Sequence, residues 1–398
     1  MPATLFMSNL FGQVNLVSNP SFEDKYNCNI ALSELYKAKY WNSLDSIKLV
    51  CGGDYYNACS INTNVTTTPK NVLSFQYPKT GTAYIASQFY CTSSCSSPYF
   101  RSYPKNRLVS NLVAGKVYCA KMYVNLINTC KFGIDAVQMY FGDISVDTIS
   151  YCGLPLTYLT PQVSNPAGNI LTDTLNWIEV SGTFTASGTE KYLLIGNFKS
   201  DAAVNKSVVD NSQADWSAFN IDDVSVIDYN LPAYAGPDKN INLGDSAFIG
   251  RPPEIGLECT WTTGTTTVGT GGGIWVKPTS LGTFSYVVTQ NLCGNIKTDT
   301  VFVNMSSGVS ENILFAQSIG IYPQPAKDVL NISLSNYYES SVKVKLFSIE
   351  GKEIESKELQ LSDYKTSIPT QNLSNGVYIL QLTNGKSQTV NKRLIITK

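Results

Sequence analysis

Short runs in which apolar and polar residues alternate recur along almost the whole chain, and they predict β-strands. In "GKVYCAKMYVNL", for example, Tyr118, Ala120 and Met122 share one face of the expected strand. Gly, Pro and Asn separate these runs, which places turns between them. Only residues 30–41 show a spacing that hints at a helix. The pattern therefore predicts an all-β fold built from antiparallel sandwiches.

Shifts in composition and turn signals divide the chain into successive parts. In order, we expect a partial signal peptide (1–13), a large sandwich rich in Tyr, Thr, Ser and Asn (14–230), a second unit (231–305), a polar linker (306–318) and a last sandwich (319–398). Prolines and glycines at the start of the second unit suggest a linker and a first turn there. The chain is thus long enough for several separate hydrophobic cores.

Charge and residue usage exclude several classes of function. The 398 residues carry 29 Lys and Arg against 30 Asp and Glu, a net charge of −1, so no overall positive field favours nucleic acid. The chain contains no His, which removes the usual general base, the Ser-His and Cys-His pairs and the commonest transition-metal ligand. We therefore expect a protein that is not an enzyme. No stretch reaches the roughly 18 apolar residues of a membrane-spanning helix.

The first residues, "MPATLFMSNLFGQ", are apolar and end in small and polar side chains, like the later part of a secretory signal. They lack the positively charged beginning of such a signal. We interpret them as a signal peptide shortened by a late start codon, with an ordinary first strand as the alternative.

Cysteine usage agrees with export to an oxidising compartment. Eight of the ten cysteines lie between Cys28 and Cys152, which favours a local disulfide framework whose connectivity the sequence leaves open. Zinc is the alternative, because Cys91 and Cys95 have a plausible ligand spacing. No second close pair and no His complete such a site, so disulfides are favoured.

The two ends of the first domain resemble a known fold. "NLVSNPSFED" (15–24) and "FNIDDVSVIDY" (219–229) are similar to the first and last strands of galactose-binding-like jelly rolls, which occur as carbohydrate-binding modules. The resemblance implies that Glu23 and Asp222 help to bind a structural calcium ion. Alternatively, Asp222 and Asp223 cap a turn or pair with a lysine. No other cofactor is expected.

Sugar binding would require aromatic faces beside polar groups. The aromatic candidates in stretches expected to be loops are Tyr55, Tyr56, Tyr99, Tyr103 and Trp216. Trp41 and Trp177 have apolar neighbours and are expected in the core. Packing in the core remains the alternative for each candidate.

The second unit resembles the Ig-like and PKD-like spacer domains of Bacteroidetes surface proteins. Trp261 follows closely on Cys259, and the resemblance implies a bridge from Cys259 to Cys293 that joins strands of opposite sheets. A spacer role is expected for this unit.

The last 80 residues begin with "YPQPAKDVLNISL", in which Pro323 and Pro325 precede an alternating strand, and continue through a Gly turn and a hairpin with an Asn-Gly pair. They resemble the type A sorting domain of the type IX secretion system. The positions that match are Tyr322, Pro323, Pro325, Ala326, Asp328, Leu330, Gly351, Leu373, Gly376, Tyr378 and Lys392. Gln324 replaces the usual Asn, and we expect it to weaken one turn contact.

The resemblance implies a route through the periplasm to the cell surface or the extracellular space. The implied partners are the translocon and shuttle barrels of the outer membrane and a sortase-like peptidase that cuts a mobile linker at about 306–317. For the cargo we expect non-catalytic binding of glycans or of another surface protein, in adhesion or gliding. The alternative is a structural component associated with the outer-membrane secretion or motility machinery. A glycosidase that uses two carboxylates is less favoured.

Overall fold

The computed structural model describes residues 13–44, 52–92, 101–143, 155–306, 311–335, 341–360, 364–385 and 388–398. The signal-peptide prediction therefore falls almost entirely outside the described residues, and so does Tyr99. The chain forms two compact units, one with the first domain and most of the second, the other with residues 304–398 and two short segments of the second domain, 240–245 and 277–283. In the described part of the chain, no helix is both long and apolar enough to cross a bilayer.

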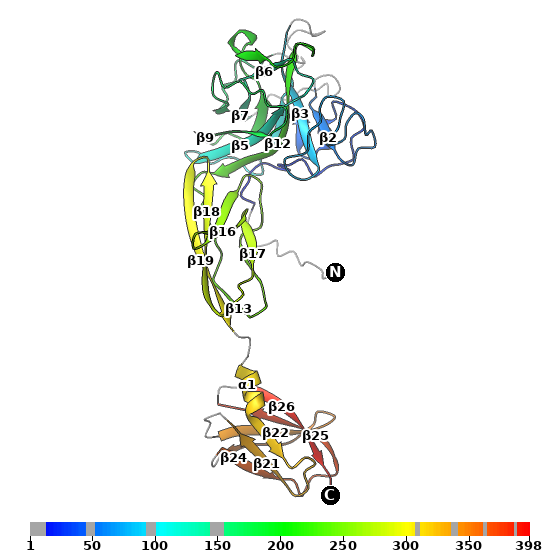
Figure 1. Ribbon diagram of the computed structural model, residues 1–398, viewed down its shortest axis with the longest axis vertical. Helices are drawn as coiled ribbons and strands as arrows, with labels where there is room; N and C mark the ends of the chain where they lie inside the picture. Colours follow the sequence, from blue (N-terminus) through cyan, green and yellow to red (C-terminus); the bar gives the residue numbers. More distant parts are fainter. Residues whose placement is uncertain are drawn as a thin grey trace. The chain divides into compact units, whose positions relative to one another are not determined.

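The first domain is a jelly roll of two five-stranded sheets, as the alternating pattern predicts (Figure 1). One sheet has the order β1 (Trp41–Ser43), β4 (Pro104–Arg107), β10 (Tyr192–Gly196), β7 (Gln138–Gly142) and β8 (Val163–Ser164). The other has the order β2 (Asp54–Asn57), β3 (Ala83–Cys91), β12 (Trp216–Asp228), β5 (Val117–Leu126) and β9 (Ile178–Thr185). A short ribbon pairs β6 (Phe132–Ile134) with β11 (Lys206–Val208), and η1 (Leu35–Lys37) and η2 (Asp201–Ala203) are single 3₁₀ turns. The helix suggested for 30–41 is thus reduced to η1.

The core of the jelly roll lies between the two sheets. Tyr118, Ala120 and Met122 of β5 all belong to it, as their alternation predicts. Trp41 is completely buried, and its indole N–H donates to the carbonyl oxygen of Asn19 at 3.0 Å. Trp177 is only partly buried and packs against the edge of the core. Burial of this aromatic and aliphatic surface is the main stabilising contribution to the domain.

The segment expected to form the first strand is held without a regular ladder. Its residue Asn15 is buried, and its side chain donates to the carbonyl oxygen of Val224 at 3.1 Å and accepts from the N–H of Val226 at 3.0 Å. The Asn15 side chain makes hydrogen bonds to β12 that a neighbouring strand would make with its backbone. The chain therefore runs beside β12 without forming a regular strand.

The second domain is a small Ig-like sandwich. Its larger sheet has the order β13 (Lys239–Asn242), β19 (Asn295–Ser306), β18 (Gly282–Leu292), β15 (Glu258–Thr263) and β16 (Thr266–Thr270), and its smaller sheet pairs β14 (Ala247–Gly250) with β17 (Gly273–Val276). Trp261 is completely buried and donates to the carbonyl oxygen of Gly271 at 2.9 Å.

The predicted bridge between Cys259 and Cys293 is wrong. Cys259 lies on β15 opposite Gln290 of β18, so these strands are neighbours in one sheet and do not face each other across the sandwich. Cys259 is a buried free thiol. Cys293 instead forms a disulfide with Cys119 of the jelly roll, 174 residues away. A second bridge, Cys28 to Cys59, closes a loop within the jelly roll.

Polar contacts surround the bridge between the first two domains. Lys121 of β5 is almost completely buried and lies 3.3 Å from the carboxylate of Glu258. The N–H of Asn15 donates to Glu254 at 2.6 Å, and the Asn295 amide donates to the carbonyl oxygen of Tyr229 at 2.8 Å. The residues that follow Tyr229 are packed against the rest of the protein, since Ala235 is completely buried. The expected linker is therefore a fixed junction.

The last domain is a two-sheet sandwich. One sheet has the order β20 (Ile319–Tyr322), β21 (Val329–Leu334) and β24 (Lys365–Pro369), and the other has the order β23 (Glu353–Gln360), β22 (Ser341–Ser348), β25 (Gly376–Thr383) and β26 (Thr389–Ile396). A helix, α1 (Glu311–Ser318), precedes β20.

The expected linker at 306–318 is partly wrong, because its end belongs to the last sandwich. Phe315 of α1 is completely buried in the core of that domain. The Lys392 ammonium donates to the carbonyl oxygen of Ala316 at 2.9 Å, and the N–H of Ser335 donates to that of Ser318 at 2.8 Å. A cut that leaves the sorting domain intact must therefore precede Phe315.

Candidate ligand-binding groove

The sheet that contains β2, β3 and β12 has a second face, turned away from the jelly-roll core. The strand register places Asp54 of β2 beside Ala86 of β3, and Ala218 of β12 beside Gln88 of β3. Side chains alternate between the faces of a strand, so these four residues share the outer face. They come from three strands that are far apart in sequence.

A loop folds over part of this outer face. The Asn71 amide donates to the hydroxyl of Tyr84 on β3 at 2.9 Å, and the Asn220 amide of β12 donates to the hydroxyl of Ser74 at 3.3 Å. These contacts hold the intervening Leu73 against the outer face, where its side chain is partly buried. The loop therefore forms one wall of a groove above the sheet.

The groove encloses a cavity of about 250 Å³. Its lining residues among those described are Leu32, Ser33, Gly52, Asp54, Leu73, Ala86, Ser87, Gln88, Ser102, Ile127, Trp216 and Ala218. An apolar wall with a few polar groups and one indole is the usual composition of a site for a small polar ligand. The cavity is of the order needed for a single sugar ring.

Asp54 supplies the only carboxylate among the described lining residues. It accepts from the N–H of Ser33 at 2.6 Å and from the hydroxyl of Tyr56 at 3.2 Å. Burial raises the pKa of Asp54 to about 6, and these two hydrogen bonds offset only part of that effect. Near neutral pH the carboxylate is ionised and can accept hydrogen bonds from ligand hydroxyls.

The pKa of Asp54 leads to a prediction about stability. A carboxyl group whose pKa is higher in the folded than in the unfolded state favours folding at low pH, and this advantage is lost as the pH rises through the folded-state value. We expect the free energy of unfolding to fall between pH 4.5 and 7.5, with about 2 kcal/mol of the fall due to Asp54. In Asp54→Asn the fall should be smaller by that amount. Denaturant unfolding at the two pH values measures the difference, and equal slopes in both proteins would contradict it.

Trp216 begins β12 at one end of the cavity. Its indole N–H donates to the carbonyl oxygen of Thr129 at 2.9 Å, which fixes the ring while leaving it partly exposed. Among the predicted aromatic ligand residues that the structure describes, Trp216 is the one that lines the groove. A ring held in one orientation loses little entropy when a sugar stacks on it.

The expected loop position is wrong for Tyr55 and Tyr56, whereas Tyr103 lies outside the strands, directly before β4. Tyr55 and Tyr56 lie on β2 and are completely buried, and Tyr103 is 5% exposed. The Tyr55 hydroxyl donates to the carbonyl oxygen of Phe22 at 2.9 Å, and that of Tyr103 donates to Asn197 at 2.8 Å. Their hydroxyls are satisfied within the domain, so these residues act in packing.

The predicted calcium ligands surround one loop. Glu23 accepts from the N–H groups of Thr82 and Ala83 at 2.8 and 2.9 Å, and Asp222 accepts from the N–H of Lys79 at 2.8 Å. Burial and the neighbouring Asp223 raise the pKa of Asp222 well above its usual value. Among the described residues, no three His, Cys, Asp or Glu side chains converge on a metal position. The carboxylates of Glu23 and Asp222 hold the loop by direct hydrogen bonds, and the calcium ion stays a prediction.

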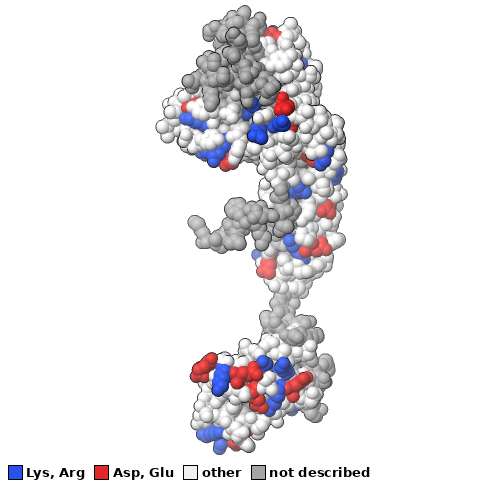
Figure 2. Space-filling model, turned by 180° about the vertical axis from the view of Figure 1, so that it is seen from behind, with Lys and Arg blue, Asp and Glu red and all other residues white. Residues whose placement is uncertain are grey.

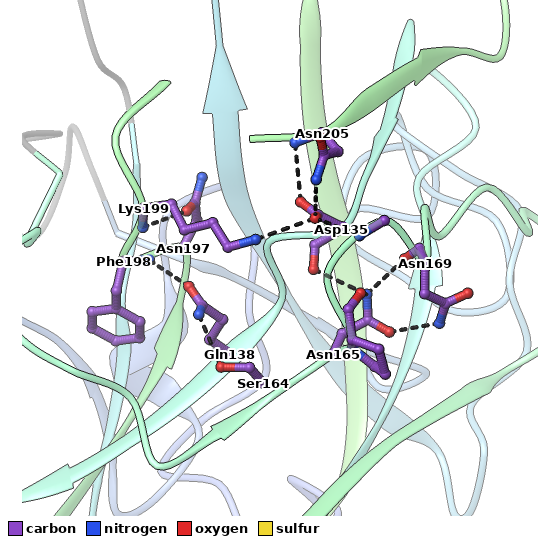
Figure 3. A network of polar contacts seen from close by, with 11 residues as sticks. Asp135, Gln138, Ser164, Asn165, Asn169, Asn197, Phe198, Lys199 and Asn205 are labelled. Atoms are coloured by element: carbon purple, nitrogen blue, oxygen red, sulfur yellow. Dashed lines mark hydrogen bonds and ion pairs between the residues drawn. The ribbon is translucent and has the colours of Figure 1, made fainter. Parts of the chain in front are cut away.

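A separate polar cluster of the jelly roll centres on Asp135 (Figure 3). Its carboxylate accepts from the side chains of Asn205 at 2.7 Å and Lys199 at 3.2 Å, and from the N–H of Gly168 at 2.9 Å. Burial alone would raise the pKa of Asp135, but these partners outweigh it and hold the pKa below its usual value. Every oxygen of this carboxylate is engaged within the domain, so the cluster fixes three loops and is not a candidate site.

The face of the molecule in Figure 2 carries basic and acidic side chains next to each other, with no region of a single sign among the described residues. Ion pairs such as Lys345 with Glu353 at 2.8 Å contribute to this mixture. This distribution agrees with the near-zero net charge, and the described residues on this face form no basic surface for a phosphate backbone.

The residues that identify the last domain in the sequence are mostly part of its fold. Ala326 and Leu330 are completely buried. The Gln324 amide donates to the carbonyl oxygen of Arg393 at 2.9 Å and accepts from the N–H of Ile395 at 3.1 Å. This longer side chain thus reaches the edge of β26 and pairs with it twice, and the expected weakening of a turn contact stays a prediction. The bends at Pro323 and Pro325 bring the chain beside that edge.

The remaining matched positions also have structural roles. Gly351 occupies a turn with φ of +84°, where a side chain would be strained. The Tyr378 hydroxyl donates to the carbonyl oxygen of Ser374 at 2.9 Å, and the carbonyl oxygen of Asp328 accepts from the N–H of Thr370 at 2.8 Å. Leu373 packs against the core, and Gly376 starts β25. Tyr322, in contrast, is 44% exposed at the end of β20.

The fold defines the chain as a multidomain β-sandwich protein that ends in a separate small sandwich. That last part belongs to the secretion system C-terminal sorting domain family, whose model matches residues 320–397. The chain is therefore a cargo of the type IX secretion system and is exported to the cell surface or the extracellular space. The expectations for fold class and secretion route are confirmed.

Comparison with curated proteins finds a similarity to beta-agarase D of Zobellia galactanivorans. The two are 34% identical over 82 residues, which is 21% of this chain and 16% of the agarase. The chain thus spans only a small part of this relative.

Solved structures with a similar fold include the CBM22-1 xylan-binding domain of Paenibacillus barcinonensis Xyn10C (13% identity, 55% of this chain and 97% of that one, TM-score 0.29). They also include the K1 cleaved adhesin domain of Lys-gingipain from Porphyromonas gingivalis W83 (13% identity, 52% and 94%, TM-score 0.24). Fibronectin(III)-like modules of Clostridium thermocellum CbhA match at 11% identity (40% and 88%, TM-score 0.22).

Proposed function

We propose that this protein is a non-catalytic cargo of type IX secretion that binds a glycan in the groove of its jelly roll and acts in adhesion at the cell surface. The observation that carries the proposal is the cavity of about 250 Å³ whose lining combines Trp216 with the polar side chains of Asp54 and Gln88. An indole face suits the C–H face of a pyranose, and the polar groups suit its hydroxyls.

The composition of the groove favours binding over hydrolysis. Glycoside hydrolysis by protein carboxylates requires two of them, roughly 5 to 10 Å apart across the bond that is cut. Among the described lining residues, Asp54 is the sole acid. A single carboxylate with neutral polar neighbours can orient a sugar. It cannot serve both as the general acid and as the nucleophile or general base that hydrolysis requires.

Substitutions in the groove test this proposal. A glycan array with the purified chain should identify a ligand, and calorimetry should then show at least a tenfold loss of affinity in Trp216→Ala and in Asp54→Ala. The matched control is Trp275→Ala, because Trp275 is a 70% exposed tryptophan on β17 of the Ig-like domain. Unchanged affinity in both groove variants, or an equal loss in the control, would contradict the proposal. Failure to bind any glycan below millimolar concentration would do so as well.

We propose as partners in export the translocon and shuttle barrels of the outer membrane and a sortase-like peptidase. A component role within the secretion or gliding machinery is the alternative function, and copurification with outer-membrane barrels in detergent would favour it. A calcium ion at Glu23 and Asp222 also remains a proposal. It is supported by the gathering of Glu23, Asp222 and Asp223 around one loop, and a melting temperature that drops on chelation is its test.

A further inference from the structure

The sheet of the sorting domain that contains β22, β25 and β26 has two faces of different character. Its inner face supplies the core, with Val344 and Leu346 of β22, Leu380 and Leu382 of β25 and Leu394 and Ile396 of β26 all nearly or completely buried. The opposite face is not covered by the domain's other sheet. In an antiparallel sheet, such a face is normally polar.

Here the outer face is apolar at its centre. Val377 and Ile379 of β25 are each 38% exposed, and Phe347 and Ile395 beside them are partly exposed. Phe347 stands opposite Ile379, and Val377 stands opposite Ile395. Side chains directly opposite on paired strands lie about 5 Å apart, so these four residues form one continuous patch across three strands. We call them the outer-face patch.

A positive charge lies at the edge of this patch. Arg393 stands opposite Ile379 on β26 and is exposed, and its guanidinium makes no ion pair with any described residue. Of the two lysines on the same face of β22, Lys345 is nearer to the patch and is already paired with Glu353 at 2.8 Å. A partner that covers the patch would therefore gain from a carboxylate placed against Arg393.

We propose that the outer-face patch, with Arg393 at its edge, is the surface by which the folded sorting domain docks on a protein of the type IX secretion machinery. That partner surface must be apolar and carry a carboxylate opposite Arg393. The core is complete without the patch residues, so their exposed apolar surface has no role in the fold. The sorting function of this domain requires that it be recognised from outside, and the outer-face patch offers exposed apolar surface for that contact.

Export of full-length variants from a Bacteroidetes host with this secretion system tests the proposal. Ile379→Lys should lower the amount of protein at the surface at least tenfold and leave it in the periplasm. Arg393→Glu should have a similar effect, and Arg393→Lys should restore most of the export. The matched control is Val329→Lys, since Val329 is 41% exposed on the outer side of β21 in the other sheet. The control should reach the surface within twofold of the native chain.

Two further measurements separate a loss of docking from a loss of folding and from contacts between copies of the chain. Melting of the purified variants should stay within a few degrees of the native chain, and if Ile379→Lys does not fold, Ile379→Thr replaces it. Normal export of Ile379→Lys and Arg393→Glu would overturn the proposal, as would an equal loss in Val329→Lys. A native chain that is dimeric in solution and becomes monomeric on Ile379→Lys would assign the patch to self-association, and this too would overturn it.

Discussion

Replacing both Cys119 and Cys293 by Ser should lower the free energy of unfolding of the first two domains by about 3 kcal/mol. The bridge joins residues 174 positions apart, so it closes a very long loop in the unfolded chain. Removing it increases the conformational freedom of the unfolded state. The junction between the two domains is then held by its non-covalent contacts alone. Denaturant unfolding under non-reducing conditions measures the loss.

Two buried free thiols in the described part of the chain supply the control for this experiment. Cys130→Ala and Cys259→Ala remove a sulfur of similar burial without opening a loop, and we expect each to cost about 1 kcal/mol. Limited proteolysis adds a second readout, because residues 229–235 should become accessible only in the Cys119/Cys293 variant. An equal loss of stability in the bridge and control variants would show that Cys119 and Cys293 act by packing and not by linking the domains.

The strands and the order of the domains follow from the sequence because alternation reports directly on which side chains face a core. Tyr118, Ala120 and Met122 lie in the core for this reason. The sorting domain is recognisable for a related reason. Positions such as Ala326 and Gly351 are fixed by burial or by a positive φ, and such local requirements limit the residues that can occupy them.

The contacts between distant strands could not be predicted in the same way. The partner of Cys293 depends on which domain packs against the β18–β19 turn, and nothing local to Cys259 or Cys293 reports this. The groove could not be predicted for the same reason. Asp54, Gln88 and Trp216 come together only through the register of three strands. Of these three residues, only Trp216 is predicted from the sequence, because an aromatic ring marks a residue as a candidate for stacking on a sugar.

Tyrosine shows the limit of residue type as a guide. Tyr55 and Tyr103 have the ring that a sugar site would use, but the same ring fills a sandwich core when its hydroxyl finds a carbonyl oxygen. The outer-face patch cannot be predicted from the sequence, because its residue types do not distinguish it from the core. Val377 and Ile379 read as ordinary strand residues, and only the register shows that they stand on the uncovered side.

The central claim is that the folded sandwich at the end of the chain directs export. Because Phe315 is part of its core, the sharpest deletion removes residues 315–398. The measurement is the fraction of the protein that is accessible to added protease on intact cells, with formation of the Cys119–Cys293 bridge as the check that the remaining domains are folded. The claim predicts at least a hundredfold fall in surface protein, with the truncated chain folded in the periplasm. A folded, truncated chain at the surface in native amounts would contradict it.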